Sequence, residues 1–213
     1  MIVDERFVDY INSLERGNPA YLDELERFAI ETDVPIIRKE MQSFLKTLLV
    51  MNRPMRILEV GTAIGFSALL MSEYMPEGAH ITTIEKYEKR IPLARANFEQ
   101  HGKSDCITLL EGDATDILAS LNETFDFIFM DAAKGQYINF LPDVLRLLEK
   151  GGVLLSDNTL QDGDIIESRF AVTRRNRTIH GRMREYLYTL KNHELLETAI
   201  LPLGDGVALS VKR

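Results

Sequence analysis

The chain has 213 residues, of which 45% are hydrophobic and 27% charged, with one cysteine, no tryptophan and a formal net charge of −8. This composition excludes disordered and collagen-like chains, and no run approaches the roughly 20 apolar residues that span a membrane. A core of this size needs neither a disulfide nor a structural metal. The N-terminal residues include acids and no long apolar stretch, so we expect a cytoplasmic protein without a signal peptide.

Three helical patterns come first and predict an N-terminal helical cap within residues 1–53. They cover residues 3–15, 19–31 and 35–51. From residue 54 onward, strand-like runs alternate with helical patterns, which is typical of a parallel α/β sheet. The predicted strands cover residues 56–60, 80–85, 107–110, 125–130 and 152–156, and the predicted helices cover residues 64–75, 87–101, 114–121, 135–149 and 170–192.

The tail predicts a closing antiparallel hairpin, because two apolar runs, residues 197–203 and 207–212, flank Gly204-Asp-Gly206. No linker divides the chain, so we expect a single domain over residues 1–213, with a core over residues 54–213. In an open sheet of this kind, ligands bind beyond the carboxyl ends of the strands. Chemistry-bearing residues are therefore sought at strand ends.

The turn after the first core strand reads Glu59-Val-Gly61-Thr62-Ala-Ile-Gly65, and its glycines let the backbone approach a ligand closely. A nicotinamide cofactor favours a different glycine spacing, and the acid before Gly61 would repel its pyrophosphate. A nicotinamide oxidoreductase is thus the weaker interpretation. A cationic ligand fits this turn better.

Acidic residues also follow the next two strands. Glu85 ends one of them, where a carboxylate can accept hydrogen bonds from two ribose hydroxyls. Asp113-Ala114 lies where the third strand gives way to a helix, so Asp113 either faces an adenine or caps that helix. With Glu59 and the glycine turn, these residues predict a site for S-adenosylmethionine, which has a ribose, an adenine and a sulfonium cation but no phosphate.

Asp131 follows the strand over residues 125–130, and Asp157-Asn158 follows the strand over residues 152–156. If the two strands are neighbours, about 4.8 Å apart, two carboxylates and an amide oxygen converge. Such ligands favour a hard divalent cation, Mg²⁺ first, with Mn²⁺ and Ca²⁺ as alternatives. The open coordination positions suit a substrate with two adjacent oxygens, whose hydroxyl loses its proton more easily once bound. The plainer interpretation of both aspartates is helix capping.

Lys134 lies three residues after Asp131, at the start of the following helix. Beside a cation and a desolvated cofactor it is a candidate general base, a role that water can also fill. The plainer alternative is a solvated lysine. Farther along, residues 169–184 contain six arginines and no acid, which favours phosphate contacts. The alternative for these arginines is a solvated helix face or ion pairs across a dimer. They are Arg169, Arg174, Arg175, Arg177, Arg182 and Arg184.

Four motifs occur in order: Glu-Val-Gly-Thr-Ala-Ile-Gly-Phe-Ser (59–67), Asp-Ala-Ala-Lys (131–134), Asp-Asn (157–158) and Gly-Asp-Gly (204–206). Together they resemble the cation-dependent O-methyltransferases, which include catechol and caffeoyl-coenzyme A methyltransferases. The resemblance covers about residues 30–213. It implies a Rossmann-like seven-stranded sheet with an antiparallel last strand, S-adenosylmethionine as methyl donor, and a homodimer.

The same resemblance implies roles for single residues. Asp131, Asp157 and Asn158 are the implied metal ligands, and Asp131 also serves catalysis and the cofactor. Lys134 is the implied base, and the implied cofactor contacts further along the chain are Ser67, Glu85 and Asp113.

Within the family, the chain most closely resembles the bacterial tRNA 5-hydroxyuridine methyltransferases. The resemblance is carried by Val34-Pro-Ile-Ile37, by residues 131–137, by the arginine-rich stretch and by residues 201–208. It implies formation of 5-methoxyuridine at the tRNA wobble position. Val34 would then lie at the cofactor, and the anticodon loop would contact Arg174, Arg175, Arg177 and Arg182.

Two chemical arguments accompany this resemblance. The O5 and O4 atoms of 5-hydroxyuridine are adjacent, so the base can chelate a metal as a catechol does. A wobble base lies in a single-stranded loop, so little unpairing energy opposes its entry into a pocket. Two alternatives stay open: the same reaction on a small catechol or a phenolic coenzyme A ester, and a non-catalytic protein that binds RNA or senses S-adenosylmethionine.

Overall fold

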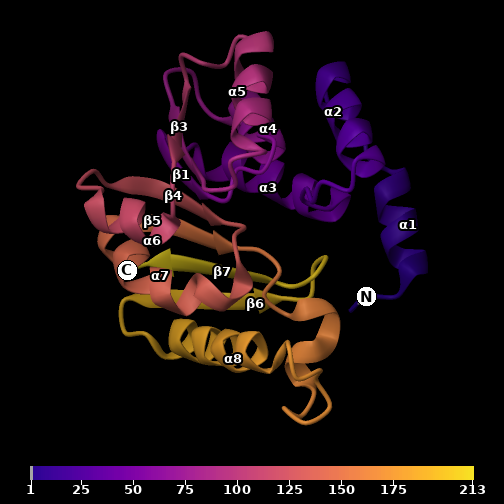
Figure 1. Cartoon of the computed structure of the whole chain (residues 1–213), viewed down its shortest axis with the longest axis vertical. Helices are drawn as coiled ribbons and strands as arrows, with labels where there is room; N and C mark the ends of the chain where they lie inside the picture. The colour runs from indigo at the N-terminus through magenta and orange to yellow at the C-terminus, as the bar shows by residue number, and fades with distance from the viewer. Residues whose placement is uncertain (1) are drawn as a thin grey trace. The chain divides into compact units, whose positions relative to one another are not determined.

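The computed structural model describes residues 2–213, which form two compact units. The N-terminal unit comprises residues 5–114, and the C-terminal unit comprises residues 115–213 together with residues 2–4. Each unit contains its own strands and helices (Figure 1). The single domain expected over residues 1–213 stays a prediction. Within residues 2–213, the structure has no helix that is both long and apolar enough to cross a membrane.

The N-terminal unit begins with the three helices expected from the sequence, α1 (Glu5–Ser13), α2 (Ala20–Glu31) and α3 (Lys39–Asn52). The third begins four residues later than predicted. The reason is Pro35, which restricts Val34 to an extended conformation, after Asp33 has left the helical region with a φ of 53°. Helix α3 packs against both α1 and α4 (Phe66–Tyr74), and α2 packs against α4.

Three parallel strands form the sheet of this unit in the order β3-β2-β1. They are β1 (Arg56–Val60), β2 (His80–Glu85) and β3 (Ile107–Glu111), and α5 (Ile91–Gln100) connects the last two. Strands β1 and β2 are buried along nearly their whole length. Both therefore end in a buried environment, which is where the predicted cofactor residues begin.

The C-terminal unit has four strands in the order β4-β5-β7-β6, with β7 antiparallel to both of its neighbours. The strands are β4 (Phe125–Met130), β5 (Leu148–Ser156), β6 (Leu196–Leu201) and β7 (Val207–Lys212). The helices are α6 (Ala114–Ser120), whose first residue belongs to the N-terminal unit, α7 (Tyr137–Leu147) and α8 (Arg177–Asn192), with short 3-10 turns η1 (Lys134–Gln136) and η2 (Gln161–Ile166). Helix α8 packs on β6 and α7 (Figure 1). The strand orders and the antiparallel β7 confirm the predicted Rossmann-like methyltransferase fold.

The largest error in the predicted elements lies before α8. The sequence suggested a helix from residue 170, whereas α8 begins at Arg177 and residues 167–176 lie outside any helix. A helix needs a buried face, and the buried row of α8 begins only at His180 and continues through Met183 and Tyr186. His180 itself is buried, although a histidine with no acidic ligand at metal-binding spacing is expected at the surface.

Candidate functional site

The ends of β4 and β5 bring the two predicted metal-binding aspartates together. These strands are parallel neighbours, and Met130 is in register with Ser156. Asp131 and Asp157, the next residues of each strand, therefore leave the sheet side by side. The Asp157 amide donates a hydrogen bond of 2.9 Å to the Met130 carbonyl, which extends the pairing to this point.

Asn158 completes the group. Its φ of 60° lies in the left-handed region, which asparagine tolerates better than most residues. This conformation lets its side-chain amide donate to Asp131 Oδ1 at 2.9 Å, while its backbone amide donates to Asp157 Oδ1 at 2.7 Å. The three side chains that the sequence proposed as metal ligands thus form one hydrogen-bonded cluster in the C-terminal unit.

The two aspartates of this cluster have raised pKa values, which favour a cation beside them. Burial raises the pKa of Asp131 to about 6, although the Asn158 hydrogen bond and Lys134 act in the opposite direction. Burial also raises the pKa of Asp157, with a further contribution from the charge of Asp131, to about 7. Two carboxylates and an amide oxygen fit a hard divalent cation such as Mg²⁺, whose charge would remove this penalty.

Tyr137 holds the two strand ends and was not assigned this role from the sequence. Its buried hydroxyl lies 3.1 Å from the Met130 carbonyl and 3.2 Å from the Asp157 carbonyl, so it donates to one of these oxygens. It accepts a hydrogen bond from the Ala132 amide. The ring packs edge-on against Tyr186, at 5.5 Å between centroids. Tyr137 is therefore part of the support of the cluster and does not offer a face to a base.

Lys134, the candidate base, is held by Asp205. Its ammonium donates to Asp205 Oδ2 at 2.7 Å, and Asp205 is only 5% exposed. The other carboxylate oxygen accepts a hydrogen bond from the backbone amide of Asp162, in η2. Gly206 permits this arrangement, because its φ is 88° and a Cβ there would lie 2.3 Å from the Leu160 side chain.

The sequence marked Gly204-Asp-Gly206 as a turn and a family motif, and it did not reveal that Asp205 contacts Lys134. Only the position of an acid between two glycines could have hinted at it. The negative charge of Asp205 also contributes to the raised pKa of Asp157.

In the N-terminal unit, the turn between β1 and α4 has the backbone expected of a ligand loop. Gly61 and Gly65 have φ values of 106° and 87°. A Cβ on Gly65 would lie 2.5 Å from the Phe98 ring, so only glycine fits there. The amide of Ala63 donates to Glu85 Oε2 at 2.7 Å. Glu85 at the end of β2 therefore fixes this turn.

The other predicted cofactor residues take part in local networks. Fully buried Glu59 accepts hydrogen bonds from Ser67, at 2.5 Å, and from Thr83, whose hydroxyl also lies 2.5 Å from that of Thr62. Glu85 also accepts from two backbone amides, those of Lys86 and Tyr87.

Three predicted cofactor residues lie outside these networks. Asp113 pairs with Lys86 at 3.2 Å, Ala114 begins α6, and Val34 is half-buried between α2 and α3. Contact of any of these residues with a cofactor stays a prediction.

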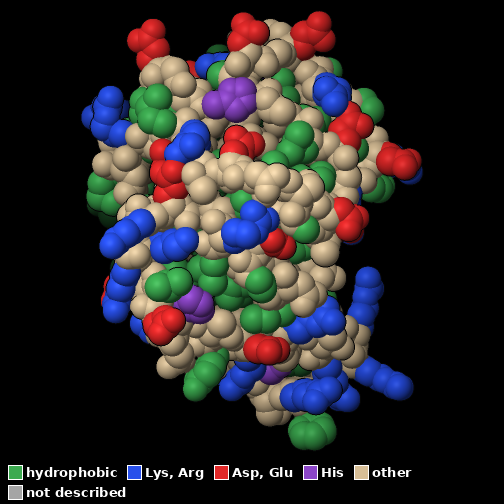
Figure 2. Space-filling model, turned by 90° about the vertical axis from the view of Figure 1, so that its left-hand side faces the viewer, with side chains coloured by type: hydrophobic (Ala, Val, Ile, Leu, Met, Phe, Trp, Pro, Cys, Tyr) green, Lys and Arg blue, Asp and Glu red, His purple; other side chains and the backbone are tan. Residues whose placement is uncertain are grey.

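The arginines before and within α8 divide into two groups. Arg182 donates to the Gly135 carbonyl at 3.0 Å and Arg184 to the Ile165 carbonyl at 3.0 Å, so these two brace η1 and η2. Arg174 and Arg175 are exposed, and Arg177 is half-buried. Figure 2 shows basic side chains gathered at the end of the molecule where Figure 1 places the loop before α8.

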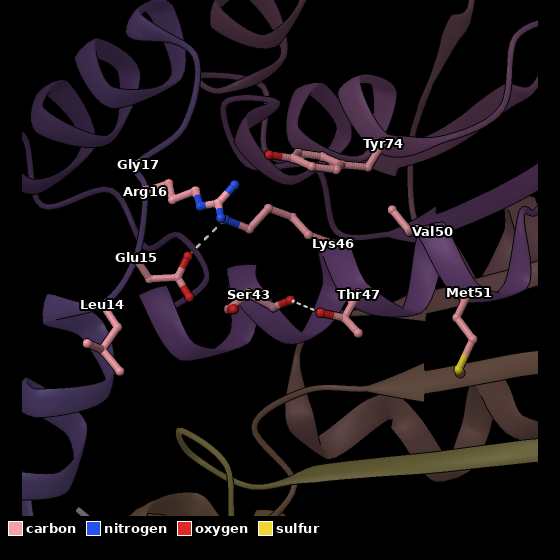
Figure 3. Close-up of a pocket in the computed structure, with 10 residues that line it drawn as sticks. All are labelled: Leu14, Glu15, Arg16, Gly17, Ser43, Lys46, Thr47, Val50, Met51 and Tyr74. Atoms are coloured by element: carbon pink, nitrogen blue, oxygen red, sulfur yellow. Dashed lines mark hydrogen bonds and ion pairs between the residues drawn. The ribbon is translucent and has the colours of Figure 1, made fainter.

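A cavity of about 650 Å³ lies in the N-terminal unit, at the end of α1 and along α3 (Figure 3). Its charged side chains include Glu15 and Lys46, which pair at 3.3 Å, with the lysine ammonium 5.8 Å from the Tyr74 ring centroid. The cavity contains none of the residues that the sequence proposed for the cofactor, the metal or tRNA.

Comparison with known proteins places these features in a family. A family model described as O-methyltransferase matches residues 12–213. A catechol O-methyltransferase from Niastella koreensis is 32% identical, over 79% of this chain and 78% of its own length. Caffeoyl-CoA O-methyltransferase 1 from Eucalyptus globulus is 30% identical, over 78% of this chain and 70% of its own length.

Two solved structures resemble this chain along nearly its whole length. One, from Staphylococcus aureus, has a TM-score of 0.90 at 29% identity, over 99% of this chain and all of that one. The other, an S-adenosylhomocysteine-bound methyltransferase from Podospora anserina, has a TM-score of 0.88 at 27% identity, over 98% of this chain and 94% of that one. The family model and the identity to these relatives lead to one conclusion: the chain belongs to the O-methyltransferase family.

Proposed function

We propose that this O-methyltransferase transfers the methyl group of S-adenosylmethionine to the 5-hydroxyl of 5-hydroxyuridine at the wobble position of tRNA, with Mg²⁺ as an essential ion. The observation that carries the metal-dependent part is the cluster of Asp131, Asp157 and Asn158. Two carboxylates with raised pKa values share this site, and a bound cation would favour the state in which both are ionised at neutral pH. Mn²⁺ and Ca²⁺ are alternatives that suit the same oxygen donors.

Asp131, Asp157 and Asn158 would hold the ion, and Tyr137 keeps their strand ends in place. A bound divalent cation would lower the pKa of an acceptor hydroxyl and favour its loss of a proton. Either Lys134 or a water molecule would take that proton. Asp205 orients the Lys134 ammonium through the 2.7 Å ion pair.

The cofactor assignment rests on the turn after β1. Its left-handed glycines leave room for close approach, and Glu59 and Glu85 suit a cation and a ribose better than a pyrophosphate. The Podospora relative with bound S-adenosylhomocysteine supports the same ligand class. The remaining residues proposed to contact the cofactor are Val34, Thr62, Ser67, Asp113, Ala114 and Asp131.

The exposed arginines and the names of the relatives favour different methyl acceptors. The exposed Arg174 and Arg175 favour a phosphate-rich acceptor such as a tRNA anticodon loop. The names of the Niastella and Eucalyptus relatives favour a small catechol or a phenolic coenzyme A ester, which is the second candidate. All of these acceptors carry two adjacent oxygens, so the metal cluster serves each equally well.

A tRNA acceptor would place the protein in the cytoplasm, and we infer that it acts there as a homodimer. Helix α1 supports the dimer, because Phe7, Tyr10 and Ile11, together with Leu14 directly after its end, are exposed and recur at the spacing of one helix face, here called the α1 face. An apolar helix face of this kind is suited to pack against a second copy of the chain.

The deciding experiment measures methyl transfer from labelled S-adenosylmethionine to three acceptors: tRNA that carries 5-hydroxyuridine, free catechol and caffeoyl-coenzyme A. Each is tested with Mg²⁺ and with EDTA. We expect metal-dependent 5-methoxyuridine, no product from Asp157→Ala, and normal product from the exposed control Asp164→Asn. Product from only the small acceptors would establish the second candidate. RNA binding with no transfer to any acceptor would instead indicate a non-catalytic protein.

A further inference from the structure

The segment from the last residue of η2 to the first residue of α8 has two highly exposed apolar side chains. Phe170 is 84% exposed and Ile166 is 81% exposed, the highest values among the large hydrophobic residues of positions 2–213. Both belong to residues 166–177, here called the Phe170 segment. Exposed aromatic surface of this kind is unfavourable in water and commonly marks a place where a ligand or partner packs.

Positive charge lies close to the exposed ring. The Arg177 guanidinium lies 5.9 Å from the centroid of the Phe170 ring, in a cation–π contact. Arg169 precedes Phe170 directly, and Arg174 and Arg175 follow it; all three are exposed. Figure 2 shows basic side chains around an exposed hydrophobic one at this end of the molecule.

An exposed aromatic ring with one guanidinium against it and further arginines near it in the sequence matches the chemistry of single-stranded RNA. A base can stack on the ring, while the arginines contact the phosphates that flank that base along the strand. A membrane surface fits less well, because residues 167–176 form no helix that could present a continuous apolar stripe.

We propose that the Phe170 segment binds an RNA loop, with Phe170 stacked on one unpaired base and Arg174 and Arg175 on neighbouring phosphates. The proposal rests on the tRNA acceptor proposed above, and it adds the residue that would recognise the loop itself. The position of the segment in the sequence fits this role, because only residues 159–165 separate it from Asn158 of the metal cluster.

The test is direct binding of a fluorescent anticodon stem-loop of unmodified nucleotides to the full chain, followed by anisotropy. We expect Phe170→Ala to weaken binding by about 10-fold or more, and Phe170→Trp to keep the affinity within about 2-fold, since stacking is worth that much per base. The matched control is Tyr188→Ala, which removes another aromatic side chain, 72% exposed on α8, and should leave the affinity unchanged. Replacing Arg174 and Arg175 by Gln should reduce the slope of log affinity against log salt by roughly 1 to 2.

Equal affinity of Phe170→Ala and the wild-type chain would overturn the proposal, as would no binding of the RNA at all. Two further arms use coenzyme A and vesicles with anionic lipid: binding of either that depends on Phe170, while RNA binding does not, would assign the segment to that ligand instead. The RNA probe contains no 5-hydroxyuridine. Phe170-dependent binding by a chain that makes no 5-methoxyuridine would therefore refute the proposed function and leave this inference standing.

Discussion

Removing one charge from the metal cluster should stabilise the metal-free protein. In the folded chain Asp157 is buried beside Asp131, and its pKa rises from 3.8 to about 7. Each unit of such a shift corresponds to about 1.4 kcal/mol, so the ionised carboxylate destabilises the fold by at most roughly 4 kcal/mol. Asp157→Asn removes that charge and keeps an oxygen to accept the hydrogen bond from the Asn158 amide.

The sign follows from proton linkage. Between pH 4 and pH 7 the folded chain holds this proton more tightly than the unfolded chain, so the free energy of unfolding falls as the pH rises through this range. The difference between Asp157→Asn and the wild type should therefore be small near pH 4 and largest above pH 7. For a chain of this length it amounts to an increase in Tm on the order of 10 °C at pH 8.

Thermal unfolding in EDTA, followed by circular dichroism at pH 5 and pH 8, checks this expectation, with Asp164→Asn as the exposed control. Adding Mg²⁺ should reduce the difference in the free energy of unfolding from at most roughly 4 to about 1 kcal/mol, because the wild type gains about 3 kcal/mol at an ion concentration 100 times its Kd and the variant gains much less. Equal Tm values of the two proteins at pH 8 in EDTA would refute the electrostatic argument. So would a Tm difference that does not change between pH 5 and pH 8.

Three other expectations follow from particular contacts. Gly65→Ala places a Cβ 2.5 Å from the Phe98 ring, so chemical denaturation should show that the free energy of unfolding falls by about 2–4 kcal/mol. Gly102→Ala, with open space around its Cβ, should reduce it by only about 1 kcal/mol. Equal reductions in the two variants would contradict the role of close packing. Asp205→Asn should lower kcat for methyl transfer. Because the Lys134 side chain is one-third exposed, the same substitution should reduce the free energy of unfolding by only about 1–2 kcal/mol. Additive losses of kcat on combining it with Lys134→Met would show that Asp205 does not act through the lysine. Leu14→Lys should convert a dimer to a monomer in sedimentation at micromolar concentration, and an unchanged dimer would exclude the α1 face as its interface.

The fold could be predicted because the sequence patterns and the tertiary structure agree. Strands 56–60, 80–85 and 125–130 were predicted with the bounds that the structure shows, since each is an apolar run with clear turn residues around it. The start of α8 at residue 177 could not be predicted in this way. It depends on where the buried face of the helix begins, and that face packs against α7 and β6, whose positions in space the local sequence pattern does not give.

The candidate metal cluster could be predicted for a different reason. Parallel neighbours place their carboxyl ends together, so the position of an acid after each of two strands is sufficient to bring Asp131 and Asp157 side by side. Tyr137 and Asp205 had no such signal. Tyr137 acts through backbone carbonyls, and Asp205 contacts Lys134, which lies 71 residues earlier in the sequence.

Tyr137 also explains how the folded chain keeps the two aspartates of the candidate site together. Two ionised carboxylates at adjacent strand ends repel each other, so contacts other than the sheet hydrogen bonds help to hold these ends in place. Tyr137 joins both ends through buried carbonyls, and Tyr186 packs against its ring while its own hydroxyl bonds Ser156. A divalent cation bound by Asp131 and Asp157 would offset this repulsion, because the contacts around the two strand ends keep their side chains close together.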